Sequence, residues 1–166
     1  YQLEDSLGRT WQCATLQLDF QMPETFNLEY TDNDGKTQRP VMVHRTIIGS
    51  VERFVGILTE HYGGAFPAWL SPVQVKVIPV SDKVIDYARA VYQQLQDVVL
   101  RTELDDRNEK LGAKIRDAQM QKTPYMIIVG QKEVETGKIT VRLRDGKDLG
   151  QMNISEFIVK VGDRVL

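Results

Sequence analysis

The sequence predicts an α/β protein, α+β overall, built from two parts: an antiparallel-sheet fragment that carries one helix, followed by an α/β domain with a mixed sheet. Three observations support this. Up to residue 62, strand-like segments joined by a turn signal precede one amphipathic helix. Residues 63–72 contain two glycines and two prolines, a composition that ends a helix and links domains. Beyond them strand and helix patterns alternate. We therefore expect domains at residues 1–71 and 72–166.

In the first domain, residues 11–20 predict a strand and residues 22–33 a connection that contains apolar residues at period two. The Asp32–Gly35 segment is a turn signal, which predicts a hairpin that returns along a strand at residues 39–45. Ser50 occupies the position of a helix N-cap. The apolar residues that follow have helical spacing, and we expect this stripe to be buried: Val51, Phe54, Val55, Leu58 and Tyr62.

The second domain is predicted to begin with a strand at residues 73–80 and a helix at residues 82–99, capped by Asp82. The remaining elements are strands at residues 102–104, 125–129 and 138–144, helices at residues 108–121 and 154–161, and a turn at residues 132–137. This order of elements implies a mixed sheet.

Composition limits the classes of function. The net charge of −2 provides no overall basic field, so any contact with RNA must use a local patch. A single cysteine, Cys13, excludes an internal disulfide and a cysteine-rich zinc site, and it favours an intracellular location and a role as a small buried residue. No apolar run approaches the roughly 18 residues of a membrane span, so no membrane partner is expected. Because the chain starts at Tyr1, we expect that more protein precedes it.

Several polar residues have two interpretations. Arg53 lies in the first turn of a helix, where a cation is disfavoured unless an anion is nearby; it either binds phosphate or pairs with a carboxylate such as Glu52. Gln12 and Gln17 on the first strand either meet a ligand or face solvent. His44 is either a hydrogen-bonded histidine or a metal ligand.

Long strings of the sequence resemble one known family. WQCATLQLDF (residues 11–20), HRTIIGSVERF (44–54), GGAFPAWLSP (63–72) and DRNEKLGAKIR (106–116) are similar, in order and separation, to threonyl-tRNA synthetases. The second string resembles the third signature motif of class II synthetases, and the last resembles a helix of their anticodon-binding domain. The resemblance implies the end of a class II catalytic domain at residues 1–71 and an anticodon-binding domain at residues 72–166.

The resemblance also implies roles for individual residues. Arg53 would be catalytic and would bind ATP together with Gln12, with magnesium accompanying the ATP, while Gln17 and Ser50 would bind threonine. His44 would be one ligand of a zinc ion whose other two ligands lie before Tyr1. The tRNA anticodon would be bound by Asn108, Lys110, Arg116, Lys132, Glu133 and Arg142.

The resemblance further implies that the full-length protein is a cytoplasmic threonine–tRNA ligase, homodimeric, with threonine, ATP and tRNA-Thr as partners. This chain alone would be inactive, because it lacks the upstream motif that holds the ATP phosphates. The alternative is a freestanding, non-catalytic RNA-binding module derived from a synthetase.

Overall fold

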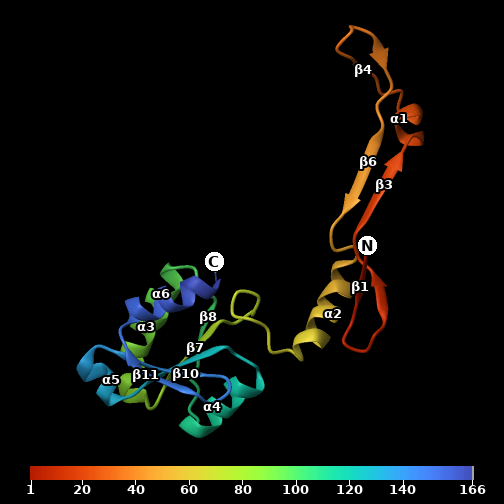
Figure 1. The fold of residues 1–166 in the computed structure, drawn as a ribbon. Helices are drawn as coiled ribbons and strands as arrows, with labels where there is room; N and C mark the ends of the chain where they lie inside the picture. The colour runs from red at the N-terminus through yellow and green to blue at the C-terminus, as the bar shows by residue number, and fades with distance from the viewer. Residues whose placement is uncertain (166) are drawn as a thin grey trace. The chain divides into compact units, whose positions relative to one another are not determined.

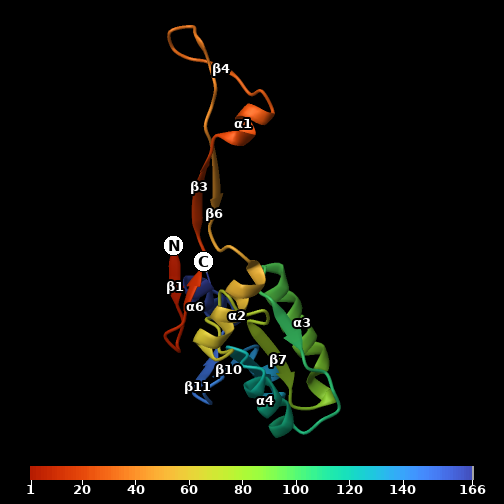
Figure 2. The same ribbon diagram turned by 90° about the vertical axis from the view of Figure 1, so that its right-hand side faces the viewer.

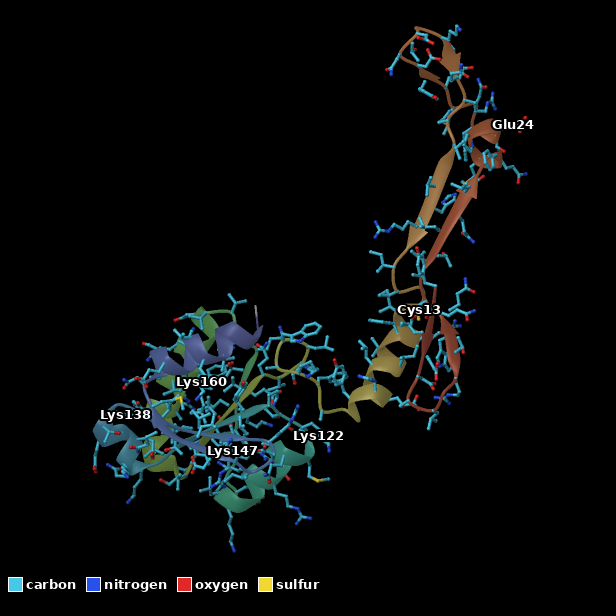
Figure 3. The ribbon with its side chains drawn as sticks, viewed as in Figure 1. Cys13, Glu24, Lys122, Lys138, Lys147 and Lys160 are labelled. Atoms are coloured by element: carbon cyan, nitrogen blue, oxygen red, sulfur yellow. The ribbon has the colours of Figure 1, made fainter. Side chains whose placement is uncertain are left out.

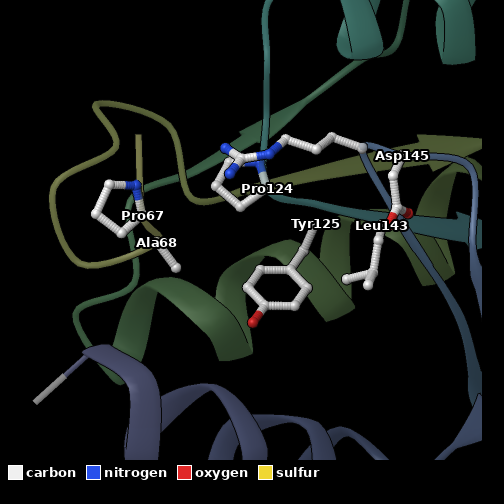
Figure 4. Close-up of a pocket in the computed structure, with 7 residues that line it drawn as sticks. Pro67, Ala68, Pro124, Tyr125, Leu143 and Asp145 are labelled. Atoms are coloured by element: carbon white, nitrogen blue, oxygen red, sulfur yellow. The ribbon is translucent and has the colours of Figure 1, made fainter. Parts of the chain in front are cut away.

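The computed structural model describes residues 1–165 and divides into two compact units, Tyr1–Gly63 and Gly64–Leu166. Residues 64–71, which the sequence assigns to the first domain, belong to the second unit. Side chains of that unit hold the backbone of this connector: Arg101 donates to the carbonyl oxygens of Ser71 and Trp69, and Arg144 donates to that of Phe66. Pro67 and Ala68 line a hollow together with Pro124, Tyr125, Leu143, Arg144 and Asp145 (Figure 4).

The first unit contains three separate two-stranded antiparallel ladders. β1 (Gln2–Glu4) pairs with β2 (Thr10–Gln12), β3 (Thr15–Asp19) pairs with β6 (Met42–Thr46), and β4 (Tyr30–Thr31) pairs with β5 (Thr37–Gln38). The single strand predicted over residues 11–20 is therefore two strands that join different partners.

The break between β2 and β3 lies at Cys13, which is buried as predicted. The loop before the next helix crosses close to it. A Cβ atom on Gly49 would lie 2.5 Å from the carbonyl oxygen of Cys13, and Gly49 has a left-handed φ of +67°. Only glycine fits this close approach without displacing the backbone.

The connection predicted over residues 22–33 contains a short helix, α1 (Gln21–Thr25), which the sequence analysis did not predict. The Oδ1 atom of Asp19 accepts hydrogen bonds from the backbone N–H groups of Gln21 and Met22 and so starts this helix. The predicted hairpin turn is confirmed, because the N–H of Gly35 donates to the carbonyl of Asp32 between β4 and β5.

The predicted helix after Ser50 is α2 (Val51–Tyr62). Its N-cap is confirmed, since the Ser50 hydroxyl accepts a hydrogen bond from the N–H of Arg53 at 3.3 Å. Gly63, at φ +54°, ends the helix. The expectation that its apolar stripe is buried is wrong for the described chain: no residue of α2 is buried, and Val51 and Val55 are more than half exposed. Within Tyr1–Gly63 no second layer covers the stripe.

The second unit is built on a mixed sheet, as predicted, but with five strands rather than the four that the sequence indicated (Figures 1 and 2). Its strand order is β11 (Asp148–Met152), β10 (Ile139–Leu143), β9 (Tyr125–Val129), β7 (Val75–Pro79) and β8 (Thr102–Leu104). β7 runs parallel to both β8 and β9, whereas β10 runs antiparallel to β9 and β11.

Helices cover both faces of this sheet. On one face, α3 (Ile85–Asp97) and α6 (Ile154–Val165) enclose the larger core, with side chains such as Val91, Leu95 and Phe157 against Val77 and Ile127. On the other face, α4 (Leu111–Met120) places Ala118 against Ile78 and Met126 in a smaller cluster. The two clusters follow from the alternation of side chains along each strand.

Four details of the second unit differ from the sequence analysis. Asp82 caps no helix, because it lies in a 3-10 turn (Asp82–Val84) before α3. The helix predicted from residue 108 begins at Leu111. The turn predicted at residues 132–137 is mostly a helix, α5 (Gln131–Thr136). The strand β11 was not predicted. Among residues 1–165, no helix is long and apolar enough to cross a membrane.

Candidate functional site

The β3–β6 ladder brings two of the predicted site residues together. Gln17 on β3 is the register partner of His44 on β6, and both side chains are exposed. Asp19 lies two residues beyond Gln17, so its side chain leaves the same face of the ladder. The Nε2 atom of His44 lies 2.8 Å from Oδ2 of Asp19. Gln17, Asp19 and His44 line one open hollow with Leu18, Phe20 and Gln21.

Asp19 is held as a carboxylate. Hydrogen bonds from the N–H of Met22, from His44 and from the N–H of Gln21 keep the pKa of Asp19 below its ordinary value, despite partial burial. An ionised carboxylate only accepts hydrogen bonds, so Nε2 of His44 carries a proton, and in the neutral ring the lone pair then lies on Nδ1. A carboxylate that orients an imidazole in this way is typical of metal-binding histidines.

The residues of this chain fit a metal only as part of a larger donor set. Among the described residues, no three histidine, cysteine, aspartate or glutamate side chains converge on one point. His44 with Asp19 behind it supplies one oriented nitrogen ligand, and zinc requires three or four protein ligands.

Arg53 projects from the first turn of α2 beside β2. Its Nη1 atom lies 3.5 Å from the carbonyl oxygen of Gln12, and its guanidinium carbon lies 5.6 Å from the centre of the Trp11 ring. The carboxylate of Glu52 accepts instead from the Ser50 hydroxyl at 2.8 Å. Among the side chains that the structure describes, no carboxylate forms an ion pair with Arg53, so the surface ion pair is excluded there. Arg53 is thus a cation at a helix N-terminus without a counter-anion.

In the second unit, Glu133 is the centre of a polar cluster on the face of the sheet opposite α3, the face that also carries Arg142. Oε1 of Glu133 accepts from the Thr140 hydroxyl at 2.8 Å and from Nε2 of Gln151 at 2.7 Å, and Oε2 accepts from the N–H of Gly130 at 2.9 Å. Arg142 follows Thr140 by two residues on β10 and therefore shares its face. These three donors occupy most of the acceptor positions of the carboxylate.

Arg142 has an unused donor. Its Nε atom is buried without a hydrogen-bond partner among the described residues, and the closest carboxylate oxygen, on Asp148, is 4.0 Å from Nη2. Buried polar groups are almost always hydrogen-bonded, so this nitrogen is an exception that an ordered water or a ligand would satisfy.

The other predicted anticodon residues are exposed and are not gathered by direct contacts. Asn108 and Lys110 lie in the bend before α4, Arg116 lies on α4, and Lys132 lies on α5. Lysines elsewhere, such as Lys122, Lys138, Lys147 and Lys160, are spread around the unit (Figure 3).

Sequence reasoning missed two residues that touch the candidate site. Asp19 could have been found from its parity with Gln17 on a strand, because alternate residues share a face. Trp11 could not have been found from the sequence. Its contact with Arg53 joins a strand to a helix 42 positions later and depends on the loop at Gly49.

Comparison with known proteins identifies the family. Residues 74–164 match the family model described as "Anticodon binding domain", and residues 2–62 match "tRNA synthetase class II core domain (G, H, P, S and T)". The chain therefore belongs to the anticodon-binding domain family, and its first 62 residues are a piece of a class II synthetase core.

The relatives described next are threonine–tRNA ligases. The chain is 60% identical to the threonine–tRNA ligase of Caldanaerobacter subterraneus subsp. tengcongensis over 97% of this chain and 25% of the relative, and 56% identical to that of Desulforamulus reducens over 99% and 26%. It thus spans about a quarter of these curated relatives and matches their C-terminal region. The crystal structure of the RNA-binding domain of threonyl-tRNA synthetase from Cryptosporidium parvum Iowa II superposes with a TM-score of 0.90 at 37% identity, covering 98% of this chain and 42% of that one.

Proposed function

We propose that this chain is the C-terminal part of a threonine–tRNA ligase and that it binds the anticodon of tRNA-Thr. The full-length enzyme activates threonine with ATP and transfers it to the tRNA. In this proposal residues 1–71 complete the catalytic domain and residues 72–166 form the anticodon-binding domain. The full-length protein is a cytoplasmic homodimer, and the fragment alone is inactive.

One observation carries the tRNA-binding role: residues 74–164 match the anticodon-binding domain, and Arg142 lies in this domain with a donor that has no partner among the described residues. Guanidinium groups recognise base edges and phosphates with paired donors, and RNA-binding proteins read unstacked bases in loops. Arg142 and Glu133 would read a base together, with the base replacing Gln151 on Glu133. The exposed residues Asn108, Lys110, Arg116 and Lys132 would contact bases or phosphates around this pair.

The catalytic contribution is assigned to the first unit. Arg53, a cation without a counter-anion, would bind the ATP phosphates with Gln12 beside it, and magnesium would accompany the ATP. Arg53 would stabilise the charge that develops there when the threonine carboxylate attacks the α-phosphorus. Gln17 and Ser50 would bind threonine.

His44 would supply one zinc ligand through Nδ1, with Asp19 fixing the ring, and the other ligands would come from protein that precedes Tyr1 in the full-length enzyme. When bound, zinc would supply a Lewis-acid position that distinguishes the threonine hydroxyl from the methyl group of valine. The described residues of this chain orient the ligand and line the hollow beside it.

Two assays on the full-length protein test the proposal. Arg142→Ala is expected to weaken charging of tRNA-Thr by about 1–3 kcal/mol while threonine-dependent ATP–pyrophosphate exchange stays unchanged. Arg89→Ala is the matched control, because it removes an exposed arginine from α3 on the opposite face of the sheet. If both variants charge tRNA equally well, Arg142 is not a recognition residue. A parent protein that shows no exchange would instead be the non-catalytic RNA-binding module.

A further inference from the structure

The surroundings of Trp11 connect it to Arg53 and to a buried carboxylate. Two guanidinium groups, those of Arg53 and Arg9, lie over the indole ring, each with its carbon 5.6 Å from the ring centre. The indole N–H donates to Oδ2 of Asp5 at 2.8 Å. An aromatic face attracts a cation through its quadrupole, so the ring holds Arg53 where no carboxylate does.

The ring is itself fixed through its N–H group, which bonds Asp5. The side chain of Asp5 is only 1% exposed, and it accepts from Nε of Arg9 at 2.6 Å and from the N–H groups of Leu7 and Arg9. Burial raises the pKa of Asp5, but the hydrogen bonds from Trp11, Arg9 and Leu7 lower it far more, so the group stays ionised.

The same network returns to the helix that carries Arg53. Nη2 of Arg9 donates to both carboxylate oxygens of Glu60 on α2, at 2.9 and 2.7 Å. The β1–β2 hairpin is thereby tied to α2 at one point by Arg9 and Glu60 and at another by Trp11 and Arg53. The indole plane and the start of the helix are held together.

We propose that Trp11 is a positioning residue for Arg53: its ring, locked by Asp5, keeps the guanidinium extended at the N-terminus of α2 with its remaining donors directed to a nucleotide phosphate. This inference rests on the proposed ATP-binding role of Arg53. A carboxylate in the place of Trp11 would also hold Arg53, but it would compete with phosphate for the same donors, whereas a ring face leaves the N–H groups free.

The test uses the full-length enzyme and ATP–pyrophosphate exchange. Trp11→Leu is expected to raise the KM for ATP by about 3- to 30-fold, the range of a lost cation–π contact, without changing the KM for threonine. Trp11→Phe keeps a ring face but loses the indole N–H that bonds Asp5, so it should recover part of the affinity for ATP. Trp69→Leu is the matched control, an exposed tryptophan in the second unit.

The double variant makes the test specific for Arg53. If Trp11 acts through Arg53, then Trp11→Leu has no further effect on the KM for ATP in an Arg53→Ala background. An equal increase in both backgrounds, an increase for both substrates alike, or no difference between the Leu and Phe variants would overturn the inference. If Arg53→Ala impairs ATP use but Trp11→Leu does not, only the inference falls. If Arg53→Ala itself leaves ATP use unchanged, the proposed role of Arg53 falls and the inference with it.

Discussion

Replacing Glu133 by glutamine tests whether its carboxylate organises the second unit. In Glu133→Gln the amide oxygen can keep the hydrogen bonds from Thr140 and Gln151, but the amide NH2 group must then face the N–H of Gly130. Two donors would oppose each other at a residue that is only 8% exposed. A buried donor left without an acceptor costs about 1–3 kcal/mol. At about 2 kcal/mol, the melting temperature of a domain of about 100 residues would fall by roughly 8–16 °C.

Thermal unfolding of this chain, followed by circular dichroism, measures the effect. Glu135→Gln is the control, because Glu135 is exposed on the same helix and its recorded hydrogen bond, from Gln131, is 3.5 Å long. Its free energy of unfolding should change by less than about 0.5 kcal/mol. Equal melting temperatures for the two variants would refute the reasoning and leave Glu133 as a residue with a role in recognition alone.

The same carboxylate makes a prediction about pH. Burial raises the pKa of Glu133, but the hydrogen bonds from Gln151, Thr140 and Gly130 lower it more, to below the ordinary value of 4.5. A group whose pKa is lower in the folded state stabilises the fold above its unfolded pKa, and this contribution is lost as the pH falls through the folded-state value. The stability difference between the parent and Glu133→Gln should therefore be full at neutral pH and shrink below about pH 4.5.

Two further predictions concern other parts of the chain. In the full-length enzyme, Asp19→Asn would present an NH2 group to Nε2 of His44 and favour the tautomer with a protonated Nδ1. The affinity for zinc should therefore fall by about 10- to 100-fold, measured by metal analysis against a competing chelator. Asp32→Asn, in a hairpin turn, is the control, and equal zinc retention by the two variants would refute the assignment. Val99 has a left-handed φ of +63° and is 87% exposed, so Val99→Gly should stabilise the second unit by about 1 kcal/mol in denaturant titrations, whereas Val98→Gly, at a φ of −97°, should not.

The elements that the sequence predicted well have their determinants close together in the chain. The start of α2 depends on Ser50 and the N–H of Arg53, three residues apart, and the hairpin turn depends on Asp32 and Gly35. One element that it missed, β11, depends on a partner outside its own segment. β11 has few apolar residues and contains Gly150 with a left-handed φ, so its own sequence does not indicate a strand. It becomes a strand because it pairs with β10. The mixed sheet was predictable because β7 and β9 are largely apolar, β10 alternates, and helical patterns separate β7 from β9.

The candidate site shows the same division between local and distant determinants. In the β4–β5 ladder Tyr30 pairs with Gln38. If the two strands continued toward β3 and β6 without an insertion, the same antiparallel register would place Val51 opposite Gln17. The structure instead pairs Gln17 with His44, seven residues earlier, because α1 and its flanking residues bulge from one strand without a counterpart on the other. Turn chemistry and period-two alternation show that two strands pair, but the length of such an insertion determines which side chains meet. The proximity of Gln17, Asp19 and His44 therefore depends on the helix that Asp19 itself starts through its hydrogen bonds to Gln21 and Met22. One carboxylate both fixes the insertion that sets the register and orients the histidine that this register brings to it.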